Sequence, residues 1–329
     1  MMVNILISIA AGCASALMFA SIISGAAVSL LLFYLAPLPL MVAALGWGGT
    51  GSAIGGVIAA LGLGTLFGWP YMAAFMVTVA LPAWWLGHLA LLGRPAAPDI
   101  APADQAPALE WYPVGRIIAW TAGLATLTTV GALLTLGTDG AAITEGLRSG
   151  LLRVMGDRGT TPQVDREQLV NALASIAPSA AAVVAMLTLT VNLWLAGKIT
   201  KTSGRLQRPW PDLKAASLPP MTLAVLSLAL AGGFVGGLVG IIGQIASAAL
   251  LMAYALHGLA TLHTLSLPIR NRTFMLGSTY AIVLTFGWPI LLMVALGLID
   301  AVFNLRGRFA PRAKPPAPRP DPTRNTDNT

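Results

Sequence analysis

The sequence predicts an all-α membrane protein, a polytopic helix bundle of about nine or ten hydrophobic segments with an amphipathic surface helix. Hydrophobic residues make up 56% of the chain and charged residues only 9%, and the mean hydropathy is +0.78. Soluble domains carry about 25% charged residues. No Asp, Glu, Lys or Arg occurs before Arg94. A soluble segment of that length would need charges, whereas each membrane span needs about 20 apolar residues.

The N-terminal half, residues 1–92, is divided by glycine, proline and tryptophan rather than by charge. Its four expected spans cover residues 4–22, 27–45, 50–67 and 71–92. Pro37 and Pro39 lie in the second span, where their missing backbone donors should kink or interrupt the helix. A membrane tolerates such a break where neighbouring helices or a cavity satisfy the freed carbonyl groups.

A polar linker, residues 93–115, joins this half to a C-terminal membrane half, residues 116–305. Spans are expected there at residues 117–136 and 178–196, with two more in residues 218–267, divided near Gly240–Gly243, and a final apolar stretch at residues 274–305. The tail, residues 306–329, is basic and rich in proline, which is typical of a disordered segment.

The segment of residues 138–177 is too polar to cross a membrane. Its apolar residues Ile143, Leu147, Leu151 and Val154 recur at helical spacing, opposite charged residues. This pattern predicts an amphipathic helix on the bilayer surface. The pair Thr161-Pro162 predicts the start of a second short helix, because threonine caps helices and proline suits the first turn.

The positions of the basic residues indicate the topology. If residues 274–305 form a short hairpin broken at Gly287-Trp288-Pro289, both termini are cytoplasmic, and the basic residues left outside are Arg148, Arg153, Arg158 and Arg166. The positive-inside rule favours this hairpin over a single span, although each arm falls short of the usual length of about 20 residues. The expected location is the bacterial inner (cytoplasmic) membrane, and the net charge of +7 is explained by topology rather than by nucleic acid.

Small residues form two ridges that predict close helix packing. The first recurs every fourth residue along the third span, with Gly51, Gly55 and Ala59 beside it, and the second lies in residues 218–267. The candidate packing residues are Gly48, Ser52, Gly56, Ala60, Gly64 and Gly68 in the first ridge, and Gly232, Gly236 and Gly240 in the second.

Few residues could carry chemistry at membrane depth. His257, His263 and Asp300 are candidates for an intramembrane enzyme, but the two histidines point about 120° apart on a helix and cannot easily share a metal. A helix-end cap or local charge pair is the favoured role for Asp300. Cys13 is the only cysteine, which excludes an internal disulfide, and it is expected to be buried. We expect no catalytic residue, metal or cofactor.

Several motifs together resemble one family. The segments are Tyr34–Leu40, Gly87–Leu92, Glu110–Arg116, Asn192–Ala196, Gly204–Trp210, His257–His263 and Gly297–Arg306. They are similar to the YybS-like bacterial membrane proteins, a family named for a domain of unknown function (number 2232). The resemblance covers residues 6–308. It further implies that the N-terminal half is similar to the substrate-binding S components of energy-coupling-factor vitamin transporters.

Two functions follow as expectations. The first is a non-enzymatic transporter subunit that binds a small molecule, with a pocket near Tyr34, Pro37, Pro39 and Trp47 among the first spans. The alternative is a structural or scaffolding protein of the bacterial envelope, whose basic loop and tail recruit anionic lipid or proteins. The expected partners are membrane lipid and other membrane subunits, and no nucleic acid.

Overall fold

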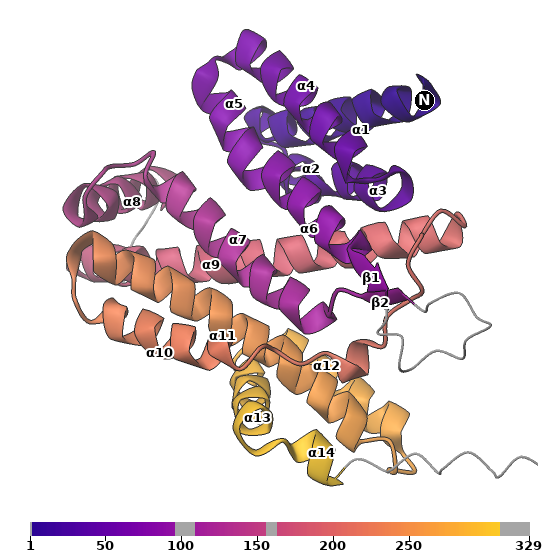
Figure 1. Ribbon diagram of the computed structural model, residues 1–329. Coiled ribbons are helices and arrows are strands. Elements are labelled where there is room, and N and C mark those ends of the chain that lie inside the picture. The colour runs from indigo at the N-terminus through magenta and orange to yellow at the C-terminus, as the bar shows by residue number, and fades with distance from the viewer. Residues whose placement is uncertain (1, 96–108, 156–162, 310–329) are drawn as a thin grey trace, which may run out of the picture.

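The computed structural model describes residues 2–95, 109–155 and 163–309 (Figure 1). Helices dominate this part of the chain, which confirms the predicted all-α class. Two short strands are the exception, and they lie within the expected polar linker. β1 (Gly93–Pro95) pairs antiparallel with β2 (Leu109–Trp111). The rest of the linker, up to residue 108, lies outside the described residues.

The N-terminal half consists of helices that pack around one core. They are α1 (Met2–Ala20), a 3-10 turn (Ser21–Ser24), α2 (Ala27–Leu35), α3 (Pro37–Trp47), α4 (Gly49–Phe67), α5 (Trp69–Phe75), a π-helical turn (Met76–Ala80) and α6 (Leu81–Leu91). The predicted interruption of the second span is confirmed, because α2 ends at Leu35 and Pro37 begins α3.

The C-terminal half contains a second core. Its elements are α7 (Val114–Leu133), α8 (Gly140–Met155), α9 (Gln163–Thr202), a 3-10 turn (Leu213–Ala215), α10 (Met221–Gly233), α11 (Gly237–Leu265), α12 (Arg272–Phe286), α13 (Ile290–Phe303) and α14 (Leu305–Phe309). Figure 1 shows α9 running across the molecule between the two halves. It contacts α3 on one side and α7 and α11 on the other.

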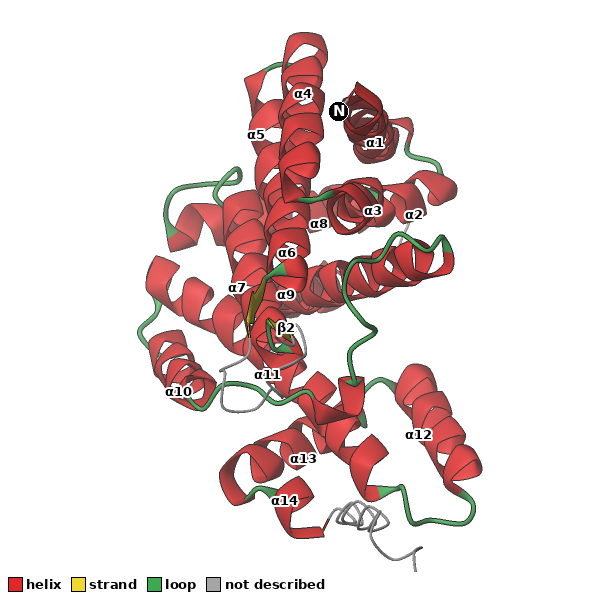
Figure 2. Ribbon diagram, turned by 45° about the vertical axis from the view of Figure 1, so that its right-hand side comes forward, coloured by secondary structure: helices red, strands yellow, loops and turns green. Residues whose placement is uncertain are grey.

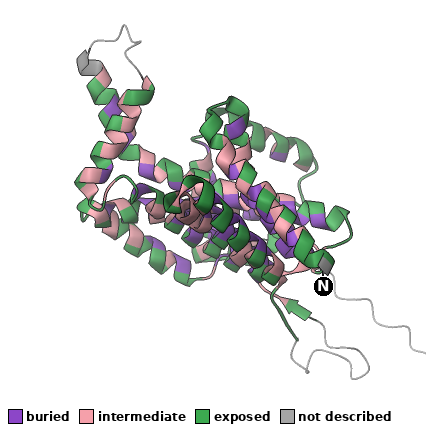
Figure 3. Cartoon of the chain, turned by 90° about the horizontal axis from the view of Figure 1, so that it is seen from above, coloured by how far each residue is buried: buried purple, intermediate pink, exposed green. Residues whose placement is uncertain are grey.

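Apolar side chains cover much of the outer surface. Leu228 is 75% exposed, and Phe234, Phe274 and Leu284 are also exposed. Figure 3 shows large exposed stretches on the helices, with buried residues in the interior. Seven helical segments of the described residues are long and apolar enough to span a membrane, judged by length and composition, and α10 and α13 are shorter apolar helices. Exposed apolar surface of this extent suits a lipid environment.

Several expected boundaries are wrong. Residues 218–267 divide at Gly236 and Gly237, which both have positive φ, and not near Gly240–Gly243. The expected second short helix and the span at 178–196 are one helix, α9, which continues through Pro178. Thr161 and Pro162 themselves lie outside the described residues.

Three further expectations need correction. Cys13 is exposed and not buried, so α1 presents this side chain outward. The tail does not begin at Arg306, because residues 305–309 form α14 and Arg306 is anchored by an ion pair. The predicted amphipathic helix exists as α8, yet Ile143 is only 1% exposed and packs into the C-terminal core, while Val154 is 86% exposed.

The predicted break in the last apolar stretch is confirmed. α12 ends at Phe286, and Gly287 adopts a φ of 69° before α13 begins at Ile290. Figure 2 shows α12 and α13 spread apart rather than packed as a pair. The cytoplasmic placement of both termini stays a prediction.

Candidate binding cavity

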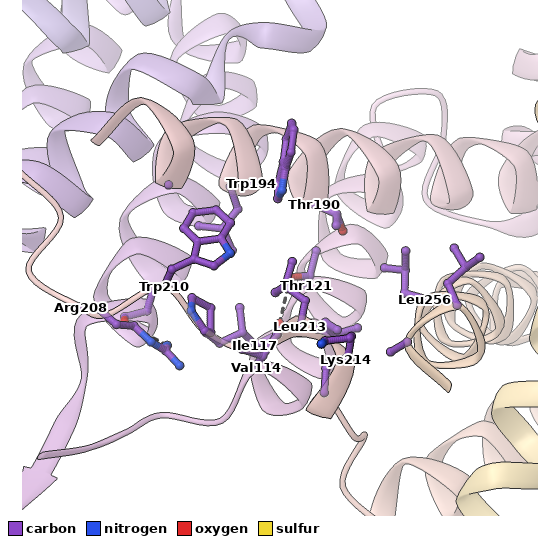
Figure 4. A pocket seen from close by; sticks show the side chains of 18 of the residues that line it. Val114, Ile117, Thr121, Thr190, Trp194, Arg208, Trp210, Leu213, Lys214 and Leu256 are labelled. Carbon is purple, nitrogen blue, oxygen red and sulfur yellow. Dashed lines mark hydrogen bonds between the residues drawn. The ribbon is translucent and has the colours of Figure 1, made fainter. Parts of the chain in front are cut away.

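A cavity of about 490 Å³ lies where the two halves meet (Figure 4). Its walls come mainly from α7, α9 and α11. The N-terminal half contributes Leu45 and Ala90, and Tyr280 is the lining residue from α12. The α9–α10 loop, residues 203–220, supplies the remaining wall from Leu206 to Ala216. We call this space the larger cavity.

Glycine sets the start of the α9–α10 loop. Gly204 has a φ of 67°, a left-handed conformation that most side chains avoid. The backbone N–H groups of Arg205 and Leu206 then both donate to the carbonyl of Thr200, which caps the C-terminal end of α9. The chain therefore turns back at this point and runs along the cavity.

Contacts with both halves hold the α9–α10 loop in place. The Arg208 guanidinium donates a hydrogen bond of 3.2 Å to the carbonyl of Ala90 at the end of α6. The indole of Trp210 lies 4.7 Å from the Lys198 ammonium and 5.1 Å from that of Lys201, distances at which cations are attracted to aromatic rings. The Asp212 carboxylate caps the following 3-10 turn by accepting from the Lys214 backbone N–H.

A buried ion-pair cluster fixes the far end of the loop. The Arg306 guanidinium donates to the backbone carbonyls of Lys214 and Ala216, each at 2.9 Å, and to the Asp300 carboxylate at 2.8 Å. Asp300 also accepts from the Arg306 backbone N–H and from the Thr261 hydroxyl. The predicted local charge pair of Asp300 is thus confirmed, and it joins α13 and α14 to the loop.

His257 completes this cluster from α11. Its Nδ1 accepts a hydrogen bond from the Leu218 backbone N–H at 3.2 Å, so Nδ1 carries no proton. The proton is therefore on Nε2, which donates to the Asp300 carboxylate at 2.7 Å. Both oxygens of Asp300 and both ring nitrogens of His257 have internal partners. Neither residue lines either of the two cavities described in this section, and we interpret the cluster as a structural clamp.

The larger cavity combines an apolar wall with positive charge. Its charged lining residues are both cations, Arg208 and Lys214, and His263 is a third nitrogen base at the wall. Arg208 is partly buried, and this burial lowers the pKa of its guanidinium from its ordinary value. Figure 4 shows Trp210 close to Arg208, and Trp194 projecting from α9 toward the middle of the cavity. The cavity is therefore suited to an apolar molecule that carries negative charge.

A smaller cavity of about 360 Å³ contains two of the four expected binding residues. Tyr34 and Pro37 line it, together with residues of α7 and α9, so it also lies between the halves. Pro39 and Trp47 line neither cavity, and Trp47 instead lies 5.7 Å from the Arg205 guanidinium. The four residues proposed from the sequence are therefore not brought together.

The small residues of the ridge on α4 pack against several different neighbours. Gly56 faces Ala80, Gly64 faces Met72, and Ser52 and Ala60 are buried. Gly48 and Gly68 lie at the two ends of α4, with φ values of 101° and 90°. The closest helix approach is at the neighbouring Gly55, where an added Cβ would overlap the backbone carbonyl of Ser8 on α1.

The second ridge lies at the α10–α11 turn. Gly236 is in the turn itself, where a Cβ would meet no atom within 4 Å. Gly232 and Gly240 face the partner helix at 3.6–3.9 Å. The tightest contact is at Gly243, whose added Cβ would lie 2.5 Å from the Gly233 backbone nitrogen.

The remaining candidate for chemistry, His263, is separate from the Asp300 clamp. Its Nε2 lies 2.8 Å from the Tyr280 hydroxyl, on the wall of the larger cavity. No group of three or more His, Cys, Asp or Glu residues that could hold a metal occurs within residues 2–95, 109–155 and 163–309.

The sequence reasoning did not identify the larger cavity. The sequence signal for it is the basic stretch from Lys198 to Lys214, which contains one tryptophan, Trp210, between Arg208 and Lys214. That pattern was interpreted as a surface for anionic lipid or partner proteins, and the loop's inward contacts are visible only in the fold.

Residues 152–301 match the family described as "Predicted membrane protein (DUF2232)". The match covers α9 to most of α13, which includes the α9–α10 loop and much of the cavity wall. It confirms the predicted family resemblance over these residues, which contain the motifs Asn192–Ala196, Gly204–Trp210 and His257–His263. No curated protein and no solved structure matches the chain.

Proposed function

We propose that this chain, a member of this family of predicted membrane proteins, is a non-enzymatic subunit that binds a small molecule in the larger cavity. In this proposal it acts in the bacterial inner membrane as a transporter subunit, in the manner of an S component, and both termini are cytoplasmic.

The observation that carries the proposal is the larger cavity itself. Small-molecule sites are concave, mostly apolar spaces of about 300–1,000 Å³ with a few polar groups. A volume of about 490 Å³ falls in this range, and the wall is apolar apart from a small set of polar residues. Because both halves contribute to the wall, relative movement of the halves would open or close it, which is the usual basis of alternating access.

The non-enzymatic part of the proposal is supported by the pairing of the ionisable groups. His257 and Asp300 are occupied by each other and by Arg306, Thr261 and Leu218. A general base needs a free acceptor within reach of a substrate proton. Neither His257 nor Asp300 presents a free acceptor atom to the larger cavity.

The test is purification in native nanodiscs followed by mass spectrometry of the co-purified small molecules. A discrete molecule at near one copy per chain is expected from the native protein. Leu256→Trp, on the cavity wall, should abolish this co-purification because the larger ring fills the space. Leu228→Trp makes the same change at a residue of α10 that is 75% exposed. This variant should still co-purify with the small molecule. Equal recovery from both variants would contradict the proposal.

The scaffold role is the alternative outcome of the same experiment. It relies on the basic loop and on the tail, of which residues 310–329 lie outside the described residues. Native nanodiscs that contain envelope proteins in stoichiometric amounts, with an empty cavity, would favour this role.

A further inference from the structure

We propose that the occupant of the larger cavity is a membrane amphiphile with an anionic head group. The head group lies against the α9–α10 loop, where Arg208 and Lys214 attract it, and the apolar body lies between α7, α9 and α11. This inference rests on the proposed function and specifies the chemical class of the ligand.

The charge of the cavity wall is the first step of the argument. Arg208 and Lys214 have no acidic partner among the described residues, and the Lys214 ammonium has no hydrogen-bond partner there either. Arg208 makes one hydrogen bond, to the Ala90 carbonyl, so most of its five N–H donors remain available. The one acid of the basic stretch between Lys198 and Lys214, Asp212, is used as a cap and does not line the cavity. Arg208 is partly buried and Lys214 is exposed at the cavity mouth, and cations without counterions favour an anion.

The apolar wall decides between a soluble anion and an amphiphile. Val114, Ile117 and Ile118 of α7 face Leu193 of α9 and Leu256 of α11 across the cavity. A small soluble anion would fill the cationic side and leave this wall in contact with water. Figure 4 shows Arg208 and Leu256 on opposite sides of the cavity, with Lys214 between them. One ligand can therefore contact the cations along the loop with its charged part and the wall at Leu256 with its apolar part.

The aromatic residues give an independent indication of lipid. Trp194 and Trp210 both line the cavity, Trp210 beside Arg208, and the Lys198 ammonium lies over both rings, at 5.6 Å and 4.7 Å. Tryptophan beside basic residues is the composition of a membrane interface, where the ring lies at the level of the lipid head groups. Trp194 is 47% exposed, so the open side of the cavity presents the arrangement that a lipid meets at a bilayer surface.

The experiment compares ligands that share a hydrocarbon tail. Native mass spectrometry of the full chain in a neutral detergent would measure binding of lysophosphatidylglycerol, which is anionic, and of lysophosphatidylcholine, which is zwitterionic. Glycerol 3-phosphate serves as a soluble phosphate anion without a hydrocarbon tail. The anionic lysolipid should bind at least about tenfold more tightly than the zwitterionic one, and glycerol 3-phosphate should not bind measurably.

Variants that remove a charge test which residues cause the preference for the anionic lysolipid. Arg208→Gln and Lys214→Gln should each reduce the preference for the anionic lysolipid by about fivefold, and the double variant should remove it. Arg205→Gln is the matched control, since Arg205 belongs to the same loop but does not line the cavity. Arg208→Lys keeps the charge and should keep most of the preference, which separates charge loss from misfolding.

Three results would overturn the inference. These are equal affinity for the two lysolipids, tight binding of glycerol 3-phosphate alone, or a preference that depends on Arg205 as much as on Arg208. Binding of both lysolipids with equal affinity that Leu256→Trp abolishes would reject the anionic head group and still support the proposed function. Absence of lysolipid binding, with another small molecule co-purifying, would likewise reject only this inference.

Discussion

The carboxylate of Asp300 is 5% exposed, and an isolated charge at such a position would be very costly to remove from water. Its three partner residues come from two helices: His257 and Thr261 on α11, and Arg306 on α14. Together they hold the α9–α10 loop against the C-terminal core. Asp300 thus orients Arg306, which binds the Lys214 and Ala216 carbonyls of the loop.

Replacing Asp300 with alanine should lower the free energy of unfolding by about 3–5 kcal/mol, because Arg306 is left buried without its partner. Thermal unfolding in a fixed detergent would measure this. Glu110→Gln is the control, since Glu110 pairs with Arg94 at 2.8 Å on the surface. Arg94 holds the pKa of Glu110 below its ordinary value, yet solvent screens this exposed pair and the variant should unfold like the native protein. An Asp300 variant as stable as the Glu110 variant would contradict the clamp.

The sequence predicted part of this clamp. Arg306 is six residues from Asp300, so a local charge pair could be inferred from spacing. His257 is 43 residues away and lies on another helix, and its contact depends on how α13 crosses α11. Single-sequence reasoning reaches contacts within a turn or two of helix, and this contact depends on tertiary packing.

At the scale of single elements, the close approach of α4 to α1 is a testable constraint. Gly55→Ala should destabilise the protein by about 1–3 kcal/mol, because its Cβ would overlap the Ser8 carbonyl and the backbones must separate. Gly62 is on the same helix, and an added Cβ there would meet no atom within 4 Å. Gly62→Ala should be neutral or stabilising by up to about 1 kcal/mol through helix propensity. Similar melting temperatures for the two variants would show that the helices do not pack in this way.

The break between α12 and α13 predicts the membrane topology of the C-terminal end of the chain. In a Cys13→Ser background, Phe309→Cys should react with a membrane-impermeant thiol reagent only from the cytoplasmic side, and Trp288→Cys only from the opposite side. Both positions are well exposed, at 70% and 65%. The reason is that Gly287 separates two short helices of 15 and 14 residues, which in the proposed hairpin topology return the chain to the same side. Labelling of both cysteines from one side would contradict the hairpin topology.

Element boundaries could be predicted where a proline or a glycine alters the backbone hydrogen bonding or the backbone conformation. Pro37 and Gly287 both marked real breaks, since proline removes a donor and glycine adopts positive φ. The α10–α11 boundary was misplaced because glycines recur throughout that region, and only the tertiary contacts distinguish packing glycines from turn glycines. Gly243 packs against Gly233, whereas Gly236 and Gly237 make the turn.

For the whole molecule, α9 is the central element. It continues past Pro178, has 40 residues in all and contacts both halves, so the cavities form along its length. The two-half organisation was expected, but neither cavity was. The larger one combines Leu45, Trp210 and Tyr280, which are far apart in the sequence, and no local pattern indicates that they share a wall.

The central claim is that the larger cavity holds a specific small molecule, and site-specific photocrosslinking tests it most directly. A photoreactive phenylalanine at Ile118, on the cavity wall, would be activated in cells, and the mass of the adduct measured on the purified chain. The same residue at Leu228, on the outer surface, reports the surrounding lipid. We predict one discrete adduct mass at Ile118 that differs from the mixture at Leu228. The same mixture at both positions, or no adduct at Ile118, would contradict the claim.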